Sequence, residues 1–391
     1  MGGARPSNRH LGAKTGAVFA EILDELRALE QKLVAHPEIG ADEQSVCEAY
    51  RWLFSITQVA LDCFVWGDVD APRFVDIVGA TKKWGGDNAD AYYQHAPIGP
   101  GRRYRVVGNR GDAVYLSLTV YAGPADGRYS ERIVDTINDR DLTFDDDGGF
   151  SFWISPEPVD SGPGIVTDPE SVVALTRDYL PDPVTMRRTS WRIEALDPAP
   201  PYRLSDDDLA RRMTCALTWI RDQAALVPVG TFGVPNDIEP PYPVPTATFG
   251  WAAGDAAYAM GQFDLADDEA LVVRGRSPGC AFWNLCLWNP LLHTYNYDRG
   301  RVTINGDQVV YEPDGSWTVV ISGRDPRHPN WVDTQGHSSG RIWLRWFLPE
   351  STPAPLECRV VPVADVERFA ADAEVGRTPG RSGLTGEPGV S

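Results

Sequence analysis

The chain has 391 residues, 42% apolar and 23% charged, a composition typical of folded globular proteins and long enough for two ordinary domains. A formal net charge of −19 repels nucleic-acid phosphates and anionic lipid headgroups, so neither nucleic acid nor membrane is expected as a partner. The 13 Trp, 14 Tyr and 13 Phe suit sandwich cores, and they also suit pockets for ring-containing or lipophilic molecules.

No segment predicts export or membrane insertion. Residues 1–16 lack an apolar segment of signal-peptide length, and no run of 18 apolar residues occurs. The six cysteines are scattered, which predicts reduced thiols and no disulfide framework. We therefore expect a cytoplasmic protein. Whether it forms a homo-oligomer stays open at this point.

Three helices are expected. Apolar residues recur at three- and four-residue steps from Val18 to Leu33, which places them on one helix face. A second helix is predicted from Glu43 to about Phe64. A third begins at Ser205, a favoured N-cap residue that is followed by three aspartates. The Pro-rich stretch 227–248 predicts an extended connection without regular structure.

The rest of the chain alternates in the manner of β-strands, and its second half repeats the first. Thr136-Ile137-Asn138 recurs as Thr303-Ile304-Asn305, an offset of 167 residues (303 − 136). The same offset pairs Asp147-Gly148 with Asp314-Gly315, where tight hairpins are expected. The segments expected to be strands are 104–108, 113–121, 150–154, 270–275, 280–288 and 316–321.

This pattern predicts a mainly β protein with two duplicated jelly-roll or β-sandwich units, an N-terminal helical segment and a helical connector. The expected divisions are a helical segment 1–80, a first unit 81–200, a helical and Pro-rich connector 201–265, a second unit 266–363 and a disordered tail 364–391.

Several segments resemble a known family. The stretch from Asn330 to Gly340, Asn-Trp-Val-Asp-Thr-Gln-Gly-His-Ser-Ser-Gly, resembles the bacterial double jelly-roll proteins of domain of unknown function 1214. So does Phe282-Trp-Asn-Leu-Cys-Leu-Trp-Asn. In the first unit, the segment from Gly85 to Tyr92 resembles the opening of the companion 1254-type domain. The resemblance implies the fold and no particular reaction.

Asp333, Thr334 and His337 form the first candidate site. A carboxylate four residues from an imidazole in a tight turn can orient the ring for acid/base chemistry. The corresponding first-unit segment, 165–170, has no histidine, which favours a functional role for the second copy. The alternative is that Asp333 and Thr334 bond their own backbone and that His337 is a structural donor.

A metal site would need His293, His328 and His337, with Asp325 or Asp333. These residues lack the short spacing of metal motifs, so we expect neither a metal nor another cofactor.

Aromatic and polar side chains of the second unit are candidate ligand contacts. Strand alternation puts Trp283 and Trp288 on opposite faces, so one is expected in the core and the other can line a cavity. Plain sandwich core is the alternative for each tryptophan. The expected substrate-binding residues are Trp283, Trp288, Trp331, Asn284 and Tyr92.

Three arginines are assigned by position. Arg177 and Arg345 occupy equivalent places in the two units, which favours a structural role bridging sheet and loop carboxylates. Arg324 lies in a turn of the second unit and is more open to a ligand.

The leading hypothesis is a cofactor-free hydrolase or lyase acting on a neutral ring-containing or lipophilic small molecule. Asp333 and His337 would transfer protons, and Arg324 would orient a polar group. The alternative is a non-catalytic small-molecule or carbohydrate-binding protein that uses the same aromatic wall. An enzyme predicts His337 in a concave pocket within hydrogen-bond reach of Asp333.

Overall fold

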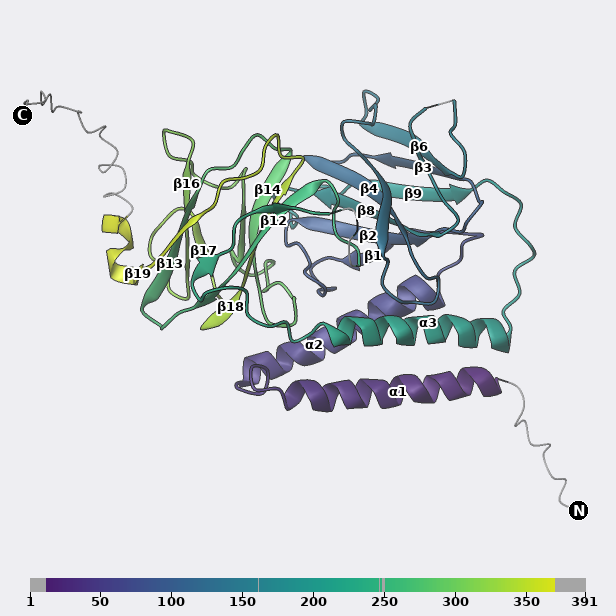
Figure 1. Ribbon diagram of the computed structural model, residues 1–391, viewed down its shortest axis with the longest axis horizontal. Coiled ribbons are helices and arrows are strands. Elements are labelled where there is room, and N and C mark those ends of the chain that lie inside the picture. The colour runs from purple at the N-terminus through teal and green to yellow at the C-terminus, as the bar shows by residue number, and fades with distance from the viewer. Residues whose placement is uncertain (1–11, 161, 246, 248–249, 370–391) are drawn as a thin grey trace, which may run out of the picture.

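The computed structural model describes residues 12–160, 162–245, 247 and 250–369. Two β-sandwich lobes lie side by side along the long axis, and three helices form a layer beneath the first lobe that reaches the second (Figure 1). The predicted mainly β fold with duplicated units, N-terminal helices and a helical connector is confirmed. Within the described residues, no helix is both long and apolar enough to span a membrane.

The strands of the first lobe are β1 (Val75–Val78), β2 (Ala91–Pro97), β3 (Tyr104–Asn109), β4 (Tyr115–Ala122), β5 (Arg132–Asn138), β6 (Gly149–Ser155), β7 (Gly164–Val166), β8 (Ser171–Tyr179) and β9 (Ser190–Ala195). Those of the second are β10 (Asp237–Ile238), β11 (Tyr242–Pro243), β12 (Ala256–Asp264), β13 (Glu269–Gly275), β14 (Phe282–Trp288), β15 (Thr303–Asn305), β16 (Trp317–Ser322), β17 (Trp331–Asp333), β18 (Ser339–Phe347) and β19 (Glu357–Pro362).

The two lobes share one topology. The first contains the sheets β1-β2-β8-β4-β5 and β7-β6-β3-β9, and the second contains β10-β12-β18-β14-β15 and β17-β16-β13-β19. Even the parallel pair β6–β7 has its counterpart in β16–β17. The repeat seen in the sequence is therefore a repeat of the whole sandwich. The two hairpin glycines, Gly148 and Gly315, have φ of 82° and 80°, as the repeated Asp-Gly pairs require.

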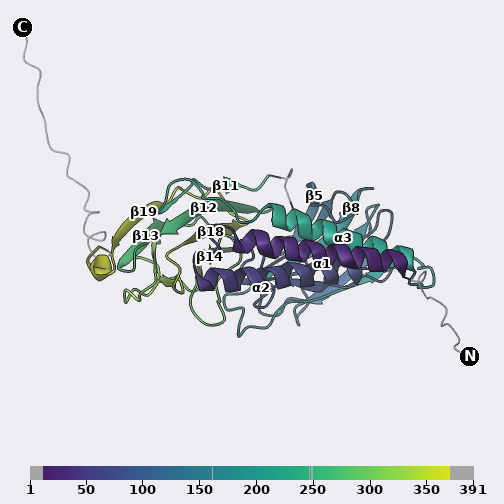
Figure 2. The same ribbon diagram turned by 90° about the horizontal axis from the view of Figure 1, so that it is seen from below.

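The helices are α1 (Ala13–Val34), α2 (Glu43–Ala60), which continues into a π-helical turn η1 (Leu61–Val65), and α3 (Asp206–Ala225). Seen from below, they lie side by side along the long axis (Figure 2). Ser205 caps α3 by accepting a hydrogen bond from the Asp208 amide at 3.1 Å, as expected for this residue type. Buried residues of the layer, including Trp52 and Trp219, share one core with Leu175 of the first lobe.

The connection after α3 differs from the sequence-based expectation. The Pro-rich stretch contains the two-residue strands β10 and β11, which both pair with β12. Short edge pairing tolerates proline because an edge strand can leave a backbone position unbonded. A short 3₁₀ turn η2 (Val363–Asp365) follows β19. The predicted disordered tail falls almost wholly on residues 370–391, outside the described part of the chain.

The lobes meet where equivalent strands end. Tyr179 closes β8 and Phe347 closes β18, and their ring centroids lie 4.2 Å apart. Each lobe also inserts an aspartate into the other. Asp90, before β2, accepts from Asn284 at 2.7 Å, and Asp255, before β12, accepts from the Tyr115 hydroxyl. The interface is thus reciprocal in its aspartates, although their donors, Asn284 and Tyr115, occupy different positions in β14 and β4.

Replacing Phe347, which is fully buried, by alanine should lower the free energy of unfolding by about 3–5 kcal/mol, since it removes a large core ring. Urea unfolding followed by circular dichroism measures the change. Phe54→Ala is the matched control because that ring is 74% exposed on α2, and its effect should stay within about 0.5 kcal/mol. Equal effects of the two substitutions would contradict the assigned interface.

Candidate functional site

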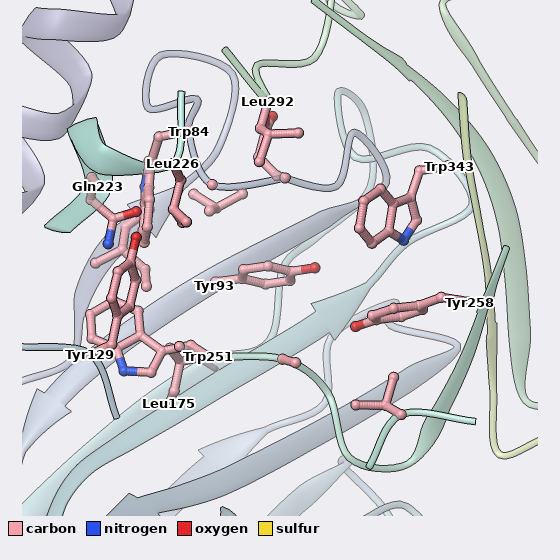
Figure 3. Close-up of a pocket in the computed structure, with 18 of the residues that line it drawn as sticks. Trp84, Tyr93, Tyr129, Leu175, Gln223, Leu226, Trp251, Tyr258, Leu292 and Trp343 are labelled. Carbon is pink, nitrogen blue, oxygen red and sulfur yellow. The ribbon is translucent and has the colours of Figure 1, made fainter. Parts of the chain in front are cut away.

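A cavity of about 300 Å³ lies between the lobes and above α3. Its wall is mainly aromatic, with rings pointing into the space from both lobes, the helix layer and the connector (Figure 3). The volume is in the range of small-molecule sites. The aromatic residues of the wall are Trp84, Tyr93, Tyr129, Trp219, Tyr242, Trp251, Tyr258, Trp288 and Trp343.

Equivalent residues of the two units line the middle of the cavity. Tyr93 on β2 faces Arg177 on β8, and Tyr258 on β12 faces Arg345 on β18, in matching cross-strand registers. Each guanidinium lies over the ring of its partner, at 5.2 Å for Arg177 and 5.7 Å for Arg345. The two tyrosine hydroxyls point toward one another across the space (Figure 3).

The role expected for these arginines is corrected. Neither Arg177 nor Arg345 forms an ion pair with a carboxylate anywhere in the described residues, although both side chains are almost wholly buried. Their strands bring them to the shared face of the two lobes and not to loop acids. The duplicated arginines were expected to support the fold; they place two positive charges in the wall of one cavity.

The two arginines differ in how fully they are bonded. Arg177 donates to the Tyr121 hydroxyl at 2.7 Å and to the Trp251 carbonyl at 2.6 Å. Arg345 donates from Nη2 to the Gly86 carbonyl at 2.5 Å, while its buried Nη1 has no hydrogen-bond partner among the described residues. The second-lobe arginine therefore keeps a free donor beside the cavity.

Trp288 and Trp343 form the wall around that donor. Their rings lie 4.5 Å apart, and the Arg345 guanidinium is 4.8 Å from the Trp288 ring and 5.6 Å from the Trp343 ring. Trp288 donates to the Asp87 carbonyl at 2.9 Å. The Trp343 Nε1 is buried and, within the part of the chain described, has no acceptor.

A Gly-Gly turn lets the chain pass this wall closely. Gly85 and Gly86 have φ of 60° and 78°, in the left-handed region that favours glycine. A Cβ at Gly86 would lie 2.9 Å from the Trp288 ring. The turn therefore explains why the segment from Gly85 carries two glycines, and it presents the Gly86 carbonyl to Arg345.

The predicted pairing of Asp333 with His337 is wrong. His337 Nε2 lies 3.1 Å from the Glu48 carboxylate on α2, and its Nδ1 donates to the Thr334 carbonyl at 2.8 Å. Asp333 instead accepts from the Gln335 amide at 2.8 Å, the local turn that was the alternative interpretation. His337 also stacks on Tyr295 at 4.0 Å, and it is not part of the cavity wall.

The Glu48–His337 pair is an interior ion pair. Burial opposes ionisation of Glu48, but the hydrogen bond and charge of His337 outweigh it and lower the Glu48 pKa to about 2. Burial likewise disfavours the imidazolium, but the hydrogen bond and charge of Glu48 raise the His337 pKa above its ordinary value. The pair links α2 to the second lobe.

The other predicted site residues are dispersed. Trp288 alone of the expected set lines the cavity. Trp283 stacks on Trp317 in the second-lobe core at 4.9 Å, and Trp331 donates to the Ser322 carbonyl on the far side of that lobe.

The polar residues predicted for the site do not line the cavity either. Asn284 donates into a buried polar cluster at Asp90. Tyr92 points to the opposite side of β2 from Tyr93, where the Arg188 guanidinium lies 3.7 Å from its ring. Arg324 is exposed in the turn after β16. These positions do not form one site.

The histidines are also separate. Across the described residues, no group of three or more His, Cys, Asp or Glu side chains is placed to hold a metal. Burial lowers the pKa of His293 to about 3, and the His328 ring accepts from the Asn330 amide at 3.2 Å.

A second cavity of about 420 Å³ shares Trp251 and Arg128 with the first. It is lined by Phe64 and by His95, whose two ring nitrogens are buried without a partner among the described residues. Burial lowers the pKa of His95 to about 4, so the ring is neutral at pH 7. Trp251 therefore contributes to the walls of both cavities.

The equivalence of Arg177 and Arg345 in the two units is a sequence feature that points toward the cavity. Arg177 and Arg345 occupy equivalent positions, and the copies of one position lie close together wherever that position is near the axis that relates the two units. Tyr93 and Tyr258 sit at matching register positions, but their spacing of 165 residues (258 − 93) differs from 167. The 167-residue offset of the repeat therefore does not pair these two tyrosines.

Comparisons with known proteins agree with the fold. A family model described as a protein of unknown function (DUF1214) matches residues 262–351, so the resemblance of the second unit is confirmed there. A solved structure of an uncharacterized protein from Burkholderia cenocepacia has a TM-score of 0.77 and 26% identity, over 90% of this chain and 98% of that one.

The VPA0106 protein from Vibrio parahaemolyticus gives a TM-score of 0.47 and 11% identity, over 79% of this chain and 98% of that one. No functionally curated protein matches the chain. The likeness of the first unit to a 1254-type domain stays a prediction.

Replacing Glu48 by glutamine should lower the His337 pKa, since the imidazolium loses its buried counterion. A pH titration of the His337 ring by NMR measures this shift. The lowered Glu48 pKa contributes stability above pH 4.5 and loses it toward pH 2, and the raised His337 pKa contributes below pH 6.5 and loses it as pH rises past its folded value.

The stability lost in Glu48→Gln should therefore be largest between about pH 4.5 and 6.5 and smaller at higher pH. Glu43→Gln, on the exposed start of α2, is the matched control and should leave the His337 titration unchanged. An unshifted His337 in Glu48→Gln would show that the pair does not form.

Proposed function

We propose that this protein binds a ring-containing or lipophilic small molecule in the cavity between its lobes. The observation that carries the proposal is the convergence of tryptophan and tyrosine rings from both lobes and α3 on one space of about 300 Å³. Such walls bind flat or apolar molecules by burying their surface and stacking on their rings.

Binding is favoured over hydrolase or lyase chemistry because the expected acid/base residues lie elsewhere. His337 is held by Glu48 and Thr334, and Asp333 by its own turn, so neither faces a molecule in the cavity. A proton-transfer residue must reach the reacting atom of its substrate within about 3 Å. The geometry therefore supports a binding protein, with carbohydrate as the alternative ligand because indole faces also suit sugars.

N-phenyl-1-naphthylamine, a neutral dye that fluoresces in apolar surroundings, should bind the cavity. Trp343→Ala should weaken this binding roughly tenfold, because the variant loses the indole ring that packs against Trp288 in the cavity wall. A fluorescence titration measures the dissociation constants of both proteins.

Trp153→Ala is the matched control, since Trp153 lies on β6 against Arg105 and outside the cavity wall. It should bind the dye as the wild type does. Absence of dye binding to the wild type, or equal weakening in both variants, would contradict the cavity as a site. Displacement of the dye by free sugars would instead favour the carbohydrate alternative.

A further inference from the structure

We propose that the molecule bound between the lobes carries an oxyanion, such as a carboxylate, which Arg345 and Trp343 bind at one end of the cavity. This inference rests on the proposed binding function and specifies the chemical class of its ligand. It departs from the neutral molecule expected from the sequence.

The donors of this end are unmatched. Trp343 and Arg345 are two residues apart on β18, so their side chains leave the same face of the sheet. Trp343 Nε1 and Arg345 Nη1 are the buried side-chain nitrogens of the cavity wall without a partner in the described residues, and both can only donate. A ligand that completes them must supply acceptors.

Arg345 also has no direct ion pair in the described residues; the carboxylates whose charges act on it are those of the buried Asp87 and Asp90. A guanidinium removed from water is costly unless hydrogen bonds and an opposite charge accompany it. The hydrogen bonds that the nearby carboxylates accept come from groups other than Arg345, and the Asp90 Oδ1 has no partner among the described residues. Asp87 accepts from the Thr294 amide at 2.9 Å, and Asp90 accepts from Asn284 and from the Thr303 hydroxyl at 3.0 Å. Neither forms an ion pair with Arg345 in the described part of the chain.

The equivalent arginine adds to the positive potential. Arg177 lines the same cavity from β8 and donates to neutral oxygens of Tyr121 and Trp251. Both of these bonds come from Nη2, and Nη1 donates to the Thr119 hydroxyl at 3.3 Å, so each terminal nitrogen of Arg177 has a partner while its charge remains. Arg128, the third arginine of the wall, is paired with Asp126 at 2.9 Å. Two buried cations without paired acids thus face one space, inside a protein whose overall charge is −19.

The far end of the cavity suits a ring. Trp84, Trp219 and Trp251 pack against one another there, with centroid distances of 4.8, 5.8 and 6.2 Å. Figure 3 shows Trp84 and Trp251 on one side of the space and Trp343 with Tyr258 on the other. An aromatic or lipophilic body at the indole end and an oxyanion at the Arg345 end fit this arrangement.

Two dyes with the same rings test the inference. 8-Anilino-1-naphthalenesulfonate differs from neutral N-phenyl-1-naphthylamine by one sulfonate, and fluorescence titration gives both dissociation constants. We expect the wild type to bind the sulfonate roughly 10- to 100-fold more tightly, the range for a charged hydrogen bond. The net charge of −19 cannot produce this preference, because it repels anions.

Variants assign the preference to its donors. Arg345→Gln should remove most of it, so that the two dissociation constants become nearly equal; a change in the shape of the wall would weaken the binding of both dyes together and leave their ratio unchanged. Trp343→Phe keeps a ring but removes the indole donor, and should reduce the preference severalfold. Arg103→Gln is the matched charge control because its side chain is 58% exposed and paired with Asp197. It should bind both dyes as the wild type does.

If Arg345→Gln does not fold, Trp343→Phe still tests the donor assignment. Equal affinity of the wild type for the two dyes would overturn the oxyanion and leave the proposed binding function standing. A sulfonate preference that survives in both Arg345→Gln and Trp343→Phe would also overturn the inference. If neither dye binds the wild type, the proposed function itself fails, and the inference with it.

Discussion

The contact between the ends of β8 and β18 determines where everything else in this molecule lies. Tyr179 packs against Phe347 with tilted rings, and Asp90 and Asp255 each accept a hydrogen bond from the opposite lobe. Because equivalent strands meet in this way, the faces of their two sheets are held next to each other. The cavity lies between these faces, and α3 and the connector complete its wall, so its shape depends first on how the two lobes meet.

The helix layer braces this arrangement from one side. α3 closes the cavity next to the first lobe with Trp219, and α2 reaches the second lobe through Glu48 and His337. Arg341, at the start of β18, also lies against Glu38, between α1 and α2, at 3.3 Å. His337, expected from the sequence to transfer protons, thus helps to hold the second lobe against the helix layer.

The alternation of apolar residues and the internal repeat predicted the fold, because local features, namely alternating strands and turn glycines, specify each sandwich. The capped start of α3 and the duplicated hairpins follow from short-range chemistry in the same way. The site could not be predicted so directly. Its wall comes from both lobes, α3 and the connector, and spacing along the chain does not show which tryptophan faces a cavity. Trp283 and Trp288 lie on one strand, yet one is core and the other lines the space.

Duplication followed by divergence makes the two ends of this site chemically different. Arg177 and Arg345 began as copies of one position, but the carbonyl of Trp251 and the hydroxyl of Tyr121 now occupy the first, while the second retains a vacant donor. A perfectly two-fold cavity would accept a guest in two reversed poses. The inequality of its arginines gives a guest one preferred direction, so an asymmetric molecule would sit in a single orientation inside a nearly symmetric protein.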